Sequence, residues 1–196
     1  MLYAQRERFA GFSEGVGRLF SRLPLSANQW TMLSLVAIAA CVFFILSHVY
    51  MMAAFFLLVA GFVDVVDGAV ARFTKTATPR GAYLDTVIDR YVEGAVAVAL
   101  LFIPAPSLFL PFSAWVGIYL IGAFMTTYVK AAAKEKELTK HDIRGGIAER
   151  SERLLLLFVG LLLGSFNLTV LAAFIVVLAV VSHITALQRL RIVKHI

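Results

Sequence analysis

The sequence predicts an all-α membrane protein with six transmembrane helices preceded by an N-terminal amphipathic interfacial helix. Hydrophobic residues make up 61% of the 196-residue chain and charged residues only 15%, whereas soluble domains average about 45–50% and about 25%. Mean hydropathy is +0.87. Three stretches, residues 23–63, 94–129 and 154–188, contain no Lys, Arg, Asp or Glu. This composition excludes a disordered chain and an ordinary soluble globule, because so much apolar surface requires a bilayer.

Each uncharged stretch predicts two membrane-spanning helices. The stretches are 41, 36 and 35 residues long, whereas one crossing needs about 20 residues. Turn-forming Ser, Pro, Gly and Asn residues occur near the middle of each stretch, within 47–50, 104–107 and 164–167. The expected helices are therefore residues 28–47, 51–72, 82–103, 108–131, 149–165 and 168–188.

The N-terminal segment predicts the interfacial helix. Apolar residues such as Phe9, Phe12 and Val16 recur near the helical period between charged residues, which is typical of a helix lying on a membrane surface. We therefore expect an amphipathic juxtamembrane helix over residues 1–23 and a six-helix transmembrane domain over 24–196.

The distribution of charge predicts the orientation. All 18 Lys and Arg residues lie outside the turns within the three helix pairs, in the two terminal segments and in the 72–90 and 130–153 regions. The positive-inside rule then places both termini and the polar face, with any active site, in the cytoplasm at the cell (plasma) membrane. In such a protein the net charge of +6 indicates contact with anionic membrane lipids and no nucleic acid.

Four aspartates lie near the facing ends of the second and third expected spans. Asp64 and Asp67 are three residues apart, and Asp85 and Asp89 are four apart, so each pair shares one helix face. The short connector between the helices makes them antiparallel neighbours, which brings the four carboxylates together. Ionised carboxylates at such spacing repel unless cations neutralise them. Oxygen ligands favour Mg²⁺, Mn²⁺ or Ca²⁺, and two ions would balance four charges.

Two glycines and an arginine accompany the aspartates. Gly68 and Gly81 allow a ligand to approach the backbone, and the forked donors of Arg72 suit a phosphate oxygen. Residues 64–89 fit the pattern D-x2-D-G-x2-A-R-x8-G-x3-D-x3-D. This pattern resembles the signature of the CDP-alcohol phosphotransferase family in every fixed position, and the six-helix plan and surface helix match that family as well.

The resemblance implies an enzyme that transfers a phosphoalcohol group from a CDP-linked donor to an alcohol acceptor and releases CMP. It implies a membrane homodimer with a dinuclear site for Mg²⁺ (or Mn²⁺). Asp64, Asp67 and Asp85 would be metal ligands, and Asp89 would be both a ligand and the general base. The implied contacts to the CDP-lipid donor are Asn28, Gln29, Trp30, Thr31, Gly68, Arg72 and Thr78.

The second half of the chain indicates the acceptor. Basic residues at the cytoplasmic helix ends would suit an anionic acceptor such as a sugar or polyol phosphate. Residues 145–154, GGIAERSERL, are similar to the branch of the family formed by phosphatidylinositol phosphate and archaetidylinositol phosphate synthases, whose acceptor is 1L-myo-inositol 1-phosphate. By this resemblance the acceptor phosphate would contact Lys130, Arg150, Arg153 and Arg189.

The sequence leaves several alternatives open. The donor would be CDP-diacylglycerol or CDP-archaeol, since lipid-facing Leu, Val and Phe suit either tail. Glycerol 3-phosphate is the nearest alternative acceptor, and a neutral alcohol such as inositol or serine is a less similar one. Two alternatives belong to other functional classes. The protein would be a divalent cation transporter whose permeation site the aspartates form, or it would be a structural membrane anchor. A transport pathway should leave polar groups on both sides of the membrane, which this sequence lacks.

Overall fold

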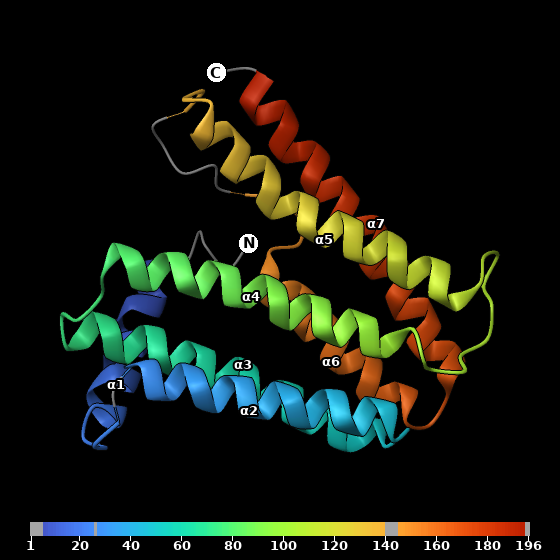
Figure 1. Ribbon diagram of the computed structural model, residues 1–196, viewed down its shortest axis with the longest axis horizontal. Helices are drawn as coiled ribbons and strands as arrows, with labels where there is room; N and C mark the ends of the chain where they lie inside the picture. The colour runs from blue at the N-terminus through green and yellow to red at the C-terminus, as the bar shows by residue number, and fades with distance from the viewer. Residues whose placement is uncertain (1–5, 26, 140–144, 195–196) are drawn as a thin grey trace.

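The computed structural model describes residues 6–25, 27–139 and 145–194, and the regular structure in these ranges is helical. The elements are α1 (Arg6–Phe20), α2 (Ala27–Leu46), α3 (Tyr50–Phe73), α4 (Pro79–Leu100), α5 (Phe112–Glu135), α6 (Arg150–Gly164) and α7 (Leu168–Lys194). The connections within the pairs α2–α3, α4–α5 and α6–α7 lie at one end of the bundle, and α1 lies at the other end (Figure 1). This is the helix pairing that the uncharged stretches predict.

Four helices are long and apolar enough to cross a membrane. They comprise Gln29–Leu46, Tyr50–Phe73, Phe112–Glu135 and Leu168–Val193. Helix α4 carries several charges in its first half, and α6 is only 15 residues long. The helical class of the fold is therefore confirmed, while four of the six predicted spans meet the requirements of length and composition.

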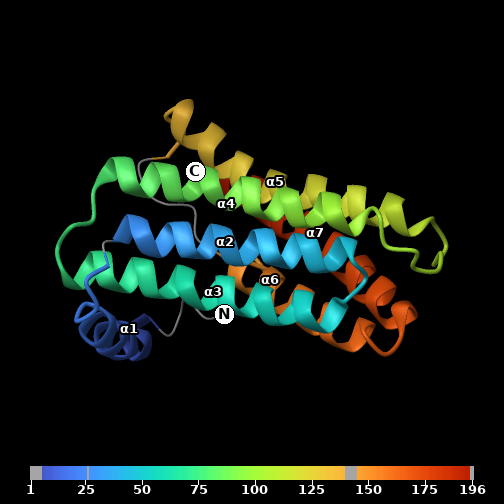
Figure 2. The same cartoon turned by 60° about the horizontal axis from the view of Figure 1, so that its bottom comes forward.

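The bundle is held together by apolar packing. Helix α2 packs along α3, α5 packs along α7, and α6 packs against both α3 and α7 (Figure 2). One buried cluster extends through α2 to α7. A smaller cluster around Trp30 and Val66 joins α1 to α2 and α3. Helix α1 approaches α3 so closely that a Cβ atom on Gly17 would lie 2.7 Å from the carbonyl oxygen of Ala69.

The starts of α4 and α6 are defined by local capping. Thr78 Oγ1 accepts a hydrogen bond from the Gly81 amide at 3.0 Å, and Pro79 occupies the first turn, where it is tolerated. At α6, Glu152 Oε2 accepts from the Glu149 amide at 2.8 Å. These caps set the point at which each helix enters the polar end of the bundle.

Candidate active site

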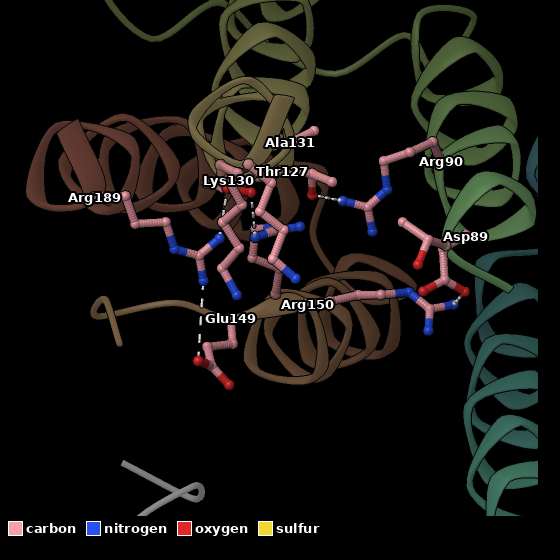
Figure 3. Close-up of a pocket in the computed structure, with 12 residues that line it drawn as sticks. Asp89, Arg90, Thr127, Lys130, Ala131, Glu149, Arg150 and Arg189 are labelled. Carbon is pink, nitrogen blue, oxygen red and sulfur yellow. Dashed lines mark hydrogen bonds and ion pairs between the residues drawn. The ribbon is translucent and has the colours of Figure 1, made fainter. Parts of the chain in front are cut away.

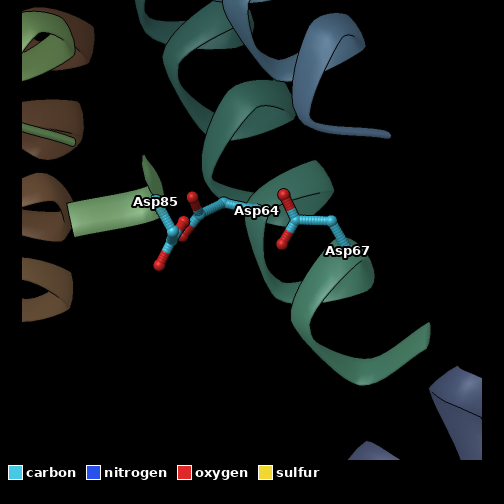
Figure 4. A group of neighbouring side chains, drawn as sticks. All are labelled: Asp64, Asp67 and Asp85. Atoms are coloured by element: carbon cyan, nitrogen blue, oxygen red, sulfur yellow. The ribbon is translucent and has the colours of Figure 1, made fainter. Parts of the chain in front are cut away.

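Three of the predicted aspartates meet between α3 and α4. Asp64 and Asp67 lie one turn apart near the end of α3, and Asp85 faces them from the start of α4 (Figure 4). One carboxylate oxygen from each residue lies within 4.8 Å of the others. Asp67 is buried, Asp64 is half-buried and Asp85 is exposed. We refer to these three residues as the acidic cluster.

The acidic cluster fits a hard divalent cation. Three carboxylates at this separation repel one another, and partial burial of the group reduces the screening by water. Their ligand atoms are all oxygens, the donor set that Mg²⁺, Mn²⁺ and Ca²⁺ prefer. Thr31 on α2 donates a hydrogen bond to Asp67 Oδ2 at 2.9 Å and so fixes the orientation of that carboxylate.

Asp89 lies beside the acidic cluster and is bound by an arginine. Arg150, the first residue of α6, places Nη2 2.7 Å from Asp89 Oδ1 and Nη1 2.9 Å from Asp64 Oδ2. One guanidinium group therefore bridges α3 and α4. Of the four aspartates that the sequence singles out, the structure gathers three within ligand distance and links the fourth to them through Arg150.

A cavity of about 440 Å³ opens on the other side of Asp89. Its volume is typical of a small-molecule site, about 300–1,000 Å³. Side chains from α4, α5, α6 and α7 converge on it (Figure 3). The lining residues are Thr86, Asp89, Arg90, Thr126, Thr127, Lys130, Ala131, Lys134, Glu149, Arg150, Arg153 and Arg189. Six of these are basic and two are acidic, so the cavity favours an anionic ligand. We call it the cationic cavity.

The four predicted acceptor-binding cations all line the cationic cavity, but they differ in their other contacts. Lys130 and Arg150 are half-buried. Arg189 is buried and donates from Nε to Gly145 O at 3.0 Å and from Nη1 to Thr126 O at 2.6 Å. The side chain of Arg153 is only 1% exposed and binds Glu93. Arg153 therefore forms part of the wall behind the cavity.

A family model described as CDP-alcohol phosphatidyltransferase matches residues 25–188. The chain belongs to this family. It is 30% identical over 178 residues to the archaetidylinositol phosphate synthase of Pyrococcus horikoshii. The matched region covers 90% of this chain and 87% of that protein. It is 32% identical over 155 residues to the phosphatidylinositol phosphate synthase of Corynebacterium glutamicum, covering 76% and 68% respectively.

Solved structures support the same membership. The phosphatidylinositol phosphate synthase of Mycobacterium tuberculosis in complex with manganese and citrate superimposes with a TM-score of 0.79 at 28% identity, covering 93% of this chain and 88% of that chain. The same enzyme with CDP-DAG bound gives a TM-score of 0.77, with 92% of each chain covered. Because the chain belongs to this family and has four helices apolar enough to cross a membrane, it is an integral membrane protein. Membership of the family also favours a transferase over the cation transporter that the sequence left open.

Three of the residues predicted to contact the CDP-lipid donor, Thr31, Gly68 and Arg72, lie near Asp67 of the acidic cluster. Thr31 binds Asp67 directly. A Cβ on Gly68 would lie 3.1 Å from Arg72 Nη1, so the glycine leaves room for that guanidinium group. Arg72 is exposed and donates to Ser13 Oγ of α1 at 2.9 Å.

The other predicted donor contacts have different surroundings. Trp30 is buried and packs edge-on against Phe20 at a centroid distance of 5.5 Å. Gln29 is exposed at the start of α2. Thr78 uses its hydroxyl group to cap α4. Asn28 lies outside the set of residues whose side chains the structure describes.

Sequence reasoning missed Glu93. This carboxylate is 3% exposed and binds Arg153, 60 residues further along the chain. A signal was present, because Glu93 follows Asp89 by one helical turn and immediately precedes an uncharged stretch, and an acid at that depth needs a partner. The identity of that partner depends on how α6 packs, which the local pattern does not reveal.

Proposed function

We propose that the protein transfers the phosphatidyl-type group of a CDP-linked lipid, CDP-diacylglycerol or CDP-archaeol, to 1L-myo-inositol 1-phosphate and releases CMP in phospholipid biosynthesis. The observation that carries this proposal is the adjacency of the acidic cluster and the cationic cavity, with Asp89 between them. The acidic cluster suits a metal-bound diphosphate, and the cationic cavity suits a phosphorylated acceptor. The names of the relatives and the CDP-DAG complex of the structural neighbour agree with this reaction.

The donor end would be held at the acidic cluster. Asp64, Asp67 and Asp85 would hold a divalent cation, Mg²⁺ or Mn²⁺, and Asp89 would complete a site for a second ion. When bound, such ions neutralise charge on the phosphate oxygens and on the CMP leaving group. Support comes from the oxygen-only donor set and from the manganese complex of the structural neighbour. Nucleotide contacts would come from residues 28–31 with Gly68, Arg72 and Thr78.

The acceptor would bind through its phosphate in the cationic cavity. Lys130, Arg150 and Arg189 approach this space from three different helices (Figure 3). Arg153 would add positive charge from the wall, although its hydrogen bonds go to protein groups. A guanidinium group binds phosphate through paired donors, so this cavity would favour a phosphorylated acceptor over a neutral alcohol.

Asp89 would accept the proton of the attacking hydroxyl group. It lines the cationic cavity and reaches the acidic cluster through Arg150, which also contacts Asp64. An acceptor phosphate that recruits Arg150 would weaken the contact of Arg150 with Asp89 and leave that carboxylate available as a base. The value of Asp89 would lie in its position, since nearby cations limit its basicity.

The remaining features concern the membrane. In addition to the four apolar helices, α4 and α6 would also cross the bilayer, with their charges at the cytoplasmic end and their ion pairs inside the bundle. The juxtamembrane segment of residues 1–23, which contains α1, would lie in the interface, ahead of the six-helix domain 24–196. Both termini and the active site would face the cytoplasm at the plasma membrane, and the enzyme would work as a homodimer.

An acceptor panel tests the proposed function. Purified enzyme is supplied with Mg²⁺ or Mn²⁺, each lipid donor in turn, and radiolabelled inositol 1-phosphate, glycerol 3-phosphate or free inositol, with CMP release as a second readout. We expect product from inositol 1-phosphate and none from free inositol. Product from glycerol 3-phosphate alone would refute the acceptor assignment, and the donor arms would separate diacylglycerol from archaeol lipids.

A further inference from the structure

A second ion pair lies one helical turn beyond the contact between Asp89 and Arg150. Arg153 donates from Nε to Glu93 Oε1 at 2.8 Å and from Nη2 to Glu93 Oε2 at 3.1 Å. The Glu93 and Arg153 side chains are 3% and 1% exposed. A charge pair this deeply buried loses its hydration, so its contacts must be complete for the fold to tolerate it.

The two ion pairs connect the same two helices. Asp89 and Glu93 are four residues apart on α4, and Arg150 and Arg153 are three residues apart on α6, so each set shares one helix face. Between the described residues of α4 and α6, these long side chains rather than close backbone packing make the connection. The cationic cavity opens at this same place. Alongside the packing of α6 on α3 and α7, the side-chain pairs therefore contribute to the separation of α4 and α6 at the site.

The inner pair is also tied to α5. The Tyr119 hydroxyl donates to Glu93 Oε1 at 3.3 Å, and Arg153 Nη1 donates to Thr126 Oγ1 at 3.3 Å. Arg153 Nη1 additionally donates to the carbonyl oxygen of Ala148 at 3.1 Å, just before α6 begins. The pair thus joins three helices and the segment that leads into one of them.

That segment is held from its other side by α7. The Ala148 amide donates to Thr185 Oγ1 at 3.0 Å, and the Ile147 amide donates to Gln188 Oε1 at 3.1 Å. Together with Arg153, these contacts hold the segment just before the capped start of α6 in place. Arg150 extends from this start to the acidic cluster, so a shift of the segment would move Arg150 as well.

We propose that Glu93 and Arg153 are positioning residues for the transfer reaction. Their buried pair sets the separation of α4 and α6 at which Asp89 and Arg150 meet, between the acidic cluster and the cationic cavity. The proposal rests on the proposed function, since it concerns the same site. Loss of the Glu93 carboxylate takes from buried Arg153 the carboxylate that it binds, and loss of Arg153 leaves Glu93 with Arg90, 3.4 Å away, as its remaining ion-pair partner. A displacement of about 1 Å at a reacting group costs up to about 100-fold in rate.

Three variants test the proposal, Glu93→Gln, Arg153→Lys and Tyr119→Phe, with Glu135→Gln as the control, because Glu135 pairs with Lys136 on the exposed surface. The measurements are kcat per folded molecule, KM for the CDP-lipid and Mn²⁺ affinity. We expect Glu93→Gln and Arg153→Lys to lower kcat at least about tenfold. Tyr119→Phe removes one long contact and should lower kcat about two- to fivefold. The KM for the donor and the Mn²⁺ affinity should change less than about twofold.

The possible outcomes are distinct. An unchanged kcat per folded molecule in the variants, even with a lower melting temperature, would show that the pair serves stability alone and would overturn the proposal. Equal losses in kcat, donor affinity and Mn²⁺ affinity would also overturn it, because they indicate general disruption. If Glu93→Gln and Arg153→Lys do not fold, the kcat of Tyr119→Phe decides. If wild-type enzyme gives no product from inositol 1-phosphate, that result refutes the proposed acceptor and not the positioning role. The kcat values are then measured with the acceptor that the enzyme does use.

Discussion

Replacing Arg150 by glutamine should tighten metal binding and weaken catalysis at the same time. Arg150 holds Asp64 Oδ2 at 2.9 Å and Asp89 Oδ1 at 2.7 Å, and Asp64 belongs to the acidic cluster. A metal ion must therefore compete with this guanidinium group for Asp64. Without Arg150 that competition disappears, while the proposed contact to the acceptor phosphate is lost as well.

The magnitude follows from the contact that is removed. A hydrogen bond to a charged group contributes about 1.5–3 kcal/mol, which corresponds to roughly 10- to 100-fold in affinity. The Asp64 side chain is 27% exposed, so solvent screening favours the lower end, about tenfold tighter Mn²⁺ binding. The acceptor kcat/KM should fall by about tenfold or more, because a charge-assisted phosphate contact is lost.

Two controls accompany this measurement. Arg150→Lys keeps the charge and should bind Mn²⁺ with nearly wild-type affinity, and Arg191→Gln makes the same change of net charge at an exposed position of α7. Mn²⁺ affinity is followed from the electron paramagnetic resonance signal of the free ion, and turnover is followed from CMP release. An Arg150→Gln variant whose Mn²⁺ affinity is unchanged or weaker would refute the competition between the guanidinium group and the metal.

Three further predictions follow from the site and the packing. Asp89→Asn should abolish turnover while leaving the fold and much of the metal binding intact; substantial residual CMP release would exclude Asp89 as the base. Gly17→Ala should lower the free energy of unfolding by about 1–3 kcal/mol, because its Cβ meets Ala69 O at 2.7 Å, whereas Gly15→Ala, at an open position of α1, should be neutral or stabilising. Chelation with EDTA should stop CMP release, and added Mn²⁺ or Mg²⁺ should restore it; full activity in EDTA would contradict the metal requirement.

The helices were largely predictable because charge and hydrophobicity are strongly segregated in this sequence. The expected span 51–72 corresponds to α3, Tyr50–Phe73. The observed helix ends differ from the expected ones where the first charged residue was taken as the end of a helix. For example, α7 was expected to end at residue 188 but continues to Lys194. The start of α4 was expected at residue 82, but Thr78 and Pro79 form a capped first turn that begins it earlier.

The candidate site was predictable to the extent that it is local. Asp64 with Asp67, and Asp85 with Asp89, could be assigned to shared helix faces from their spacing alone. The bridge from Arg150 to Asp64 joins residues 86 positions apart, and the Glu93–Arg153 pair spans 60. Such contacts depend on how α6 packs against α3 and α4, which helical periodicity does not encode.

Anomalous scattering from crystals grown with Mn²⁺ would locate the ion that the acidic cluster is expected to bind. We predict a manganese peak in coordination contact with Asp64, Asp67 and Asp85. Manganese bound elsewhere, or carboxylates turned toward separate surroundings with no ion between them, would show that the acidic cluster is not a metal site.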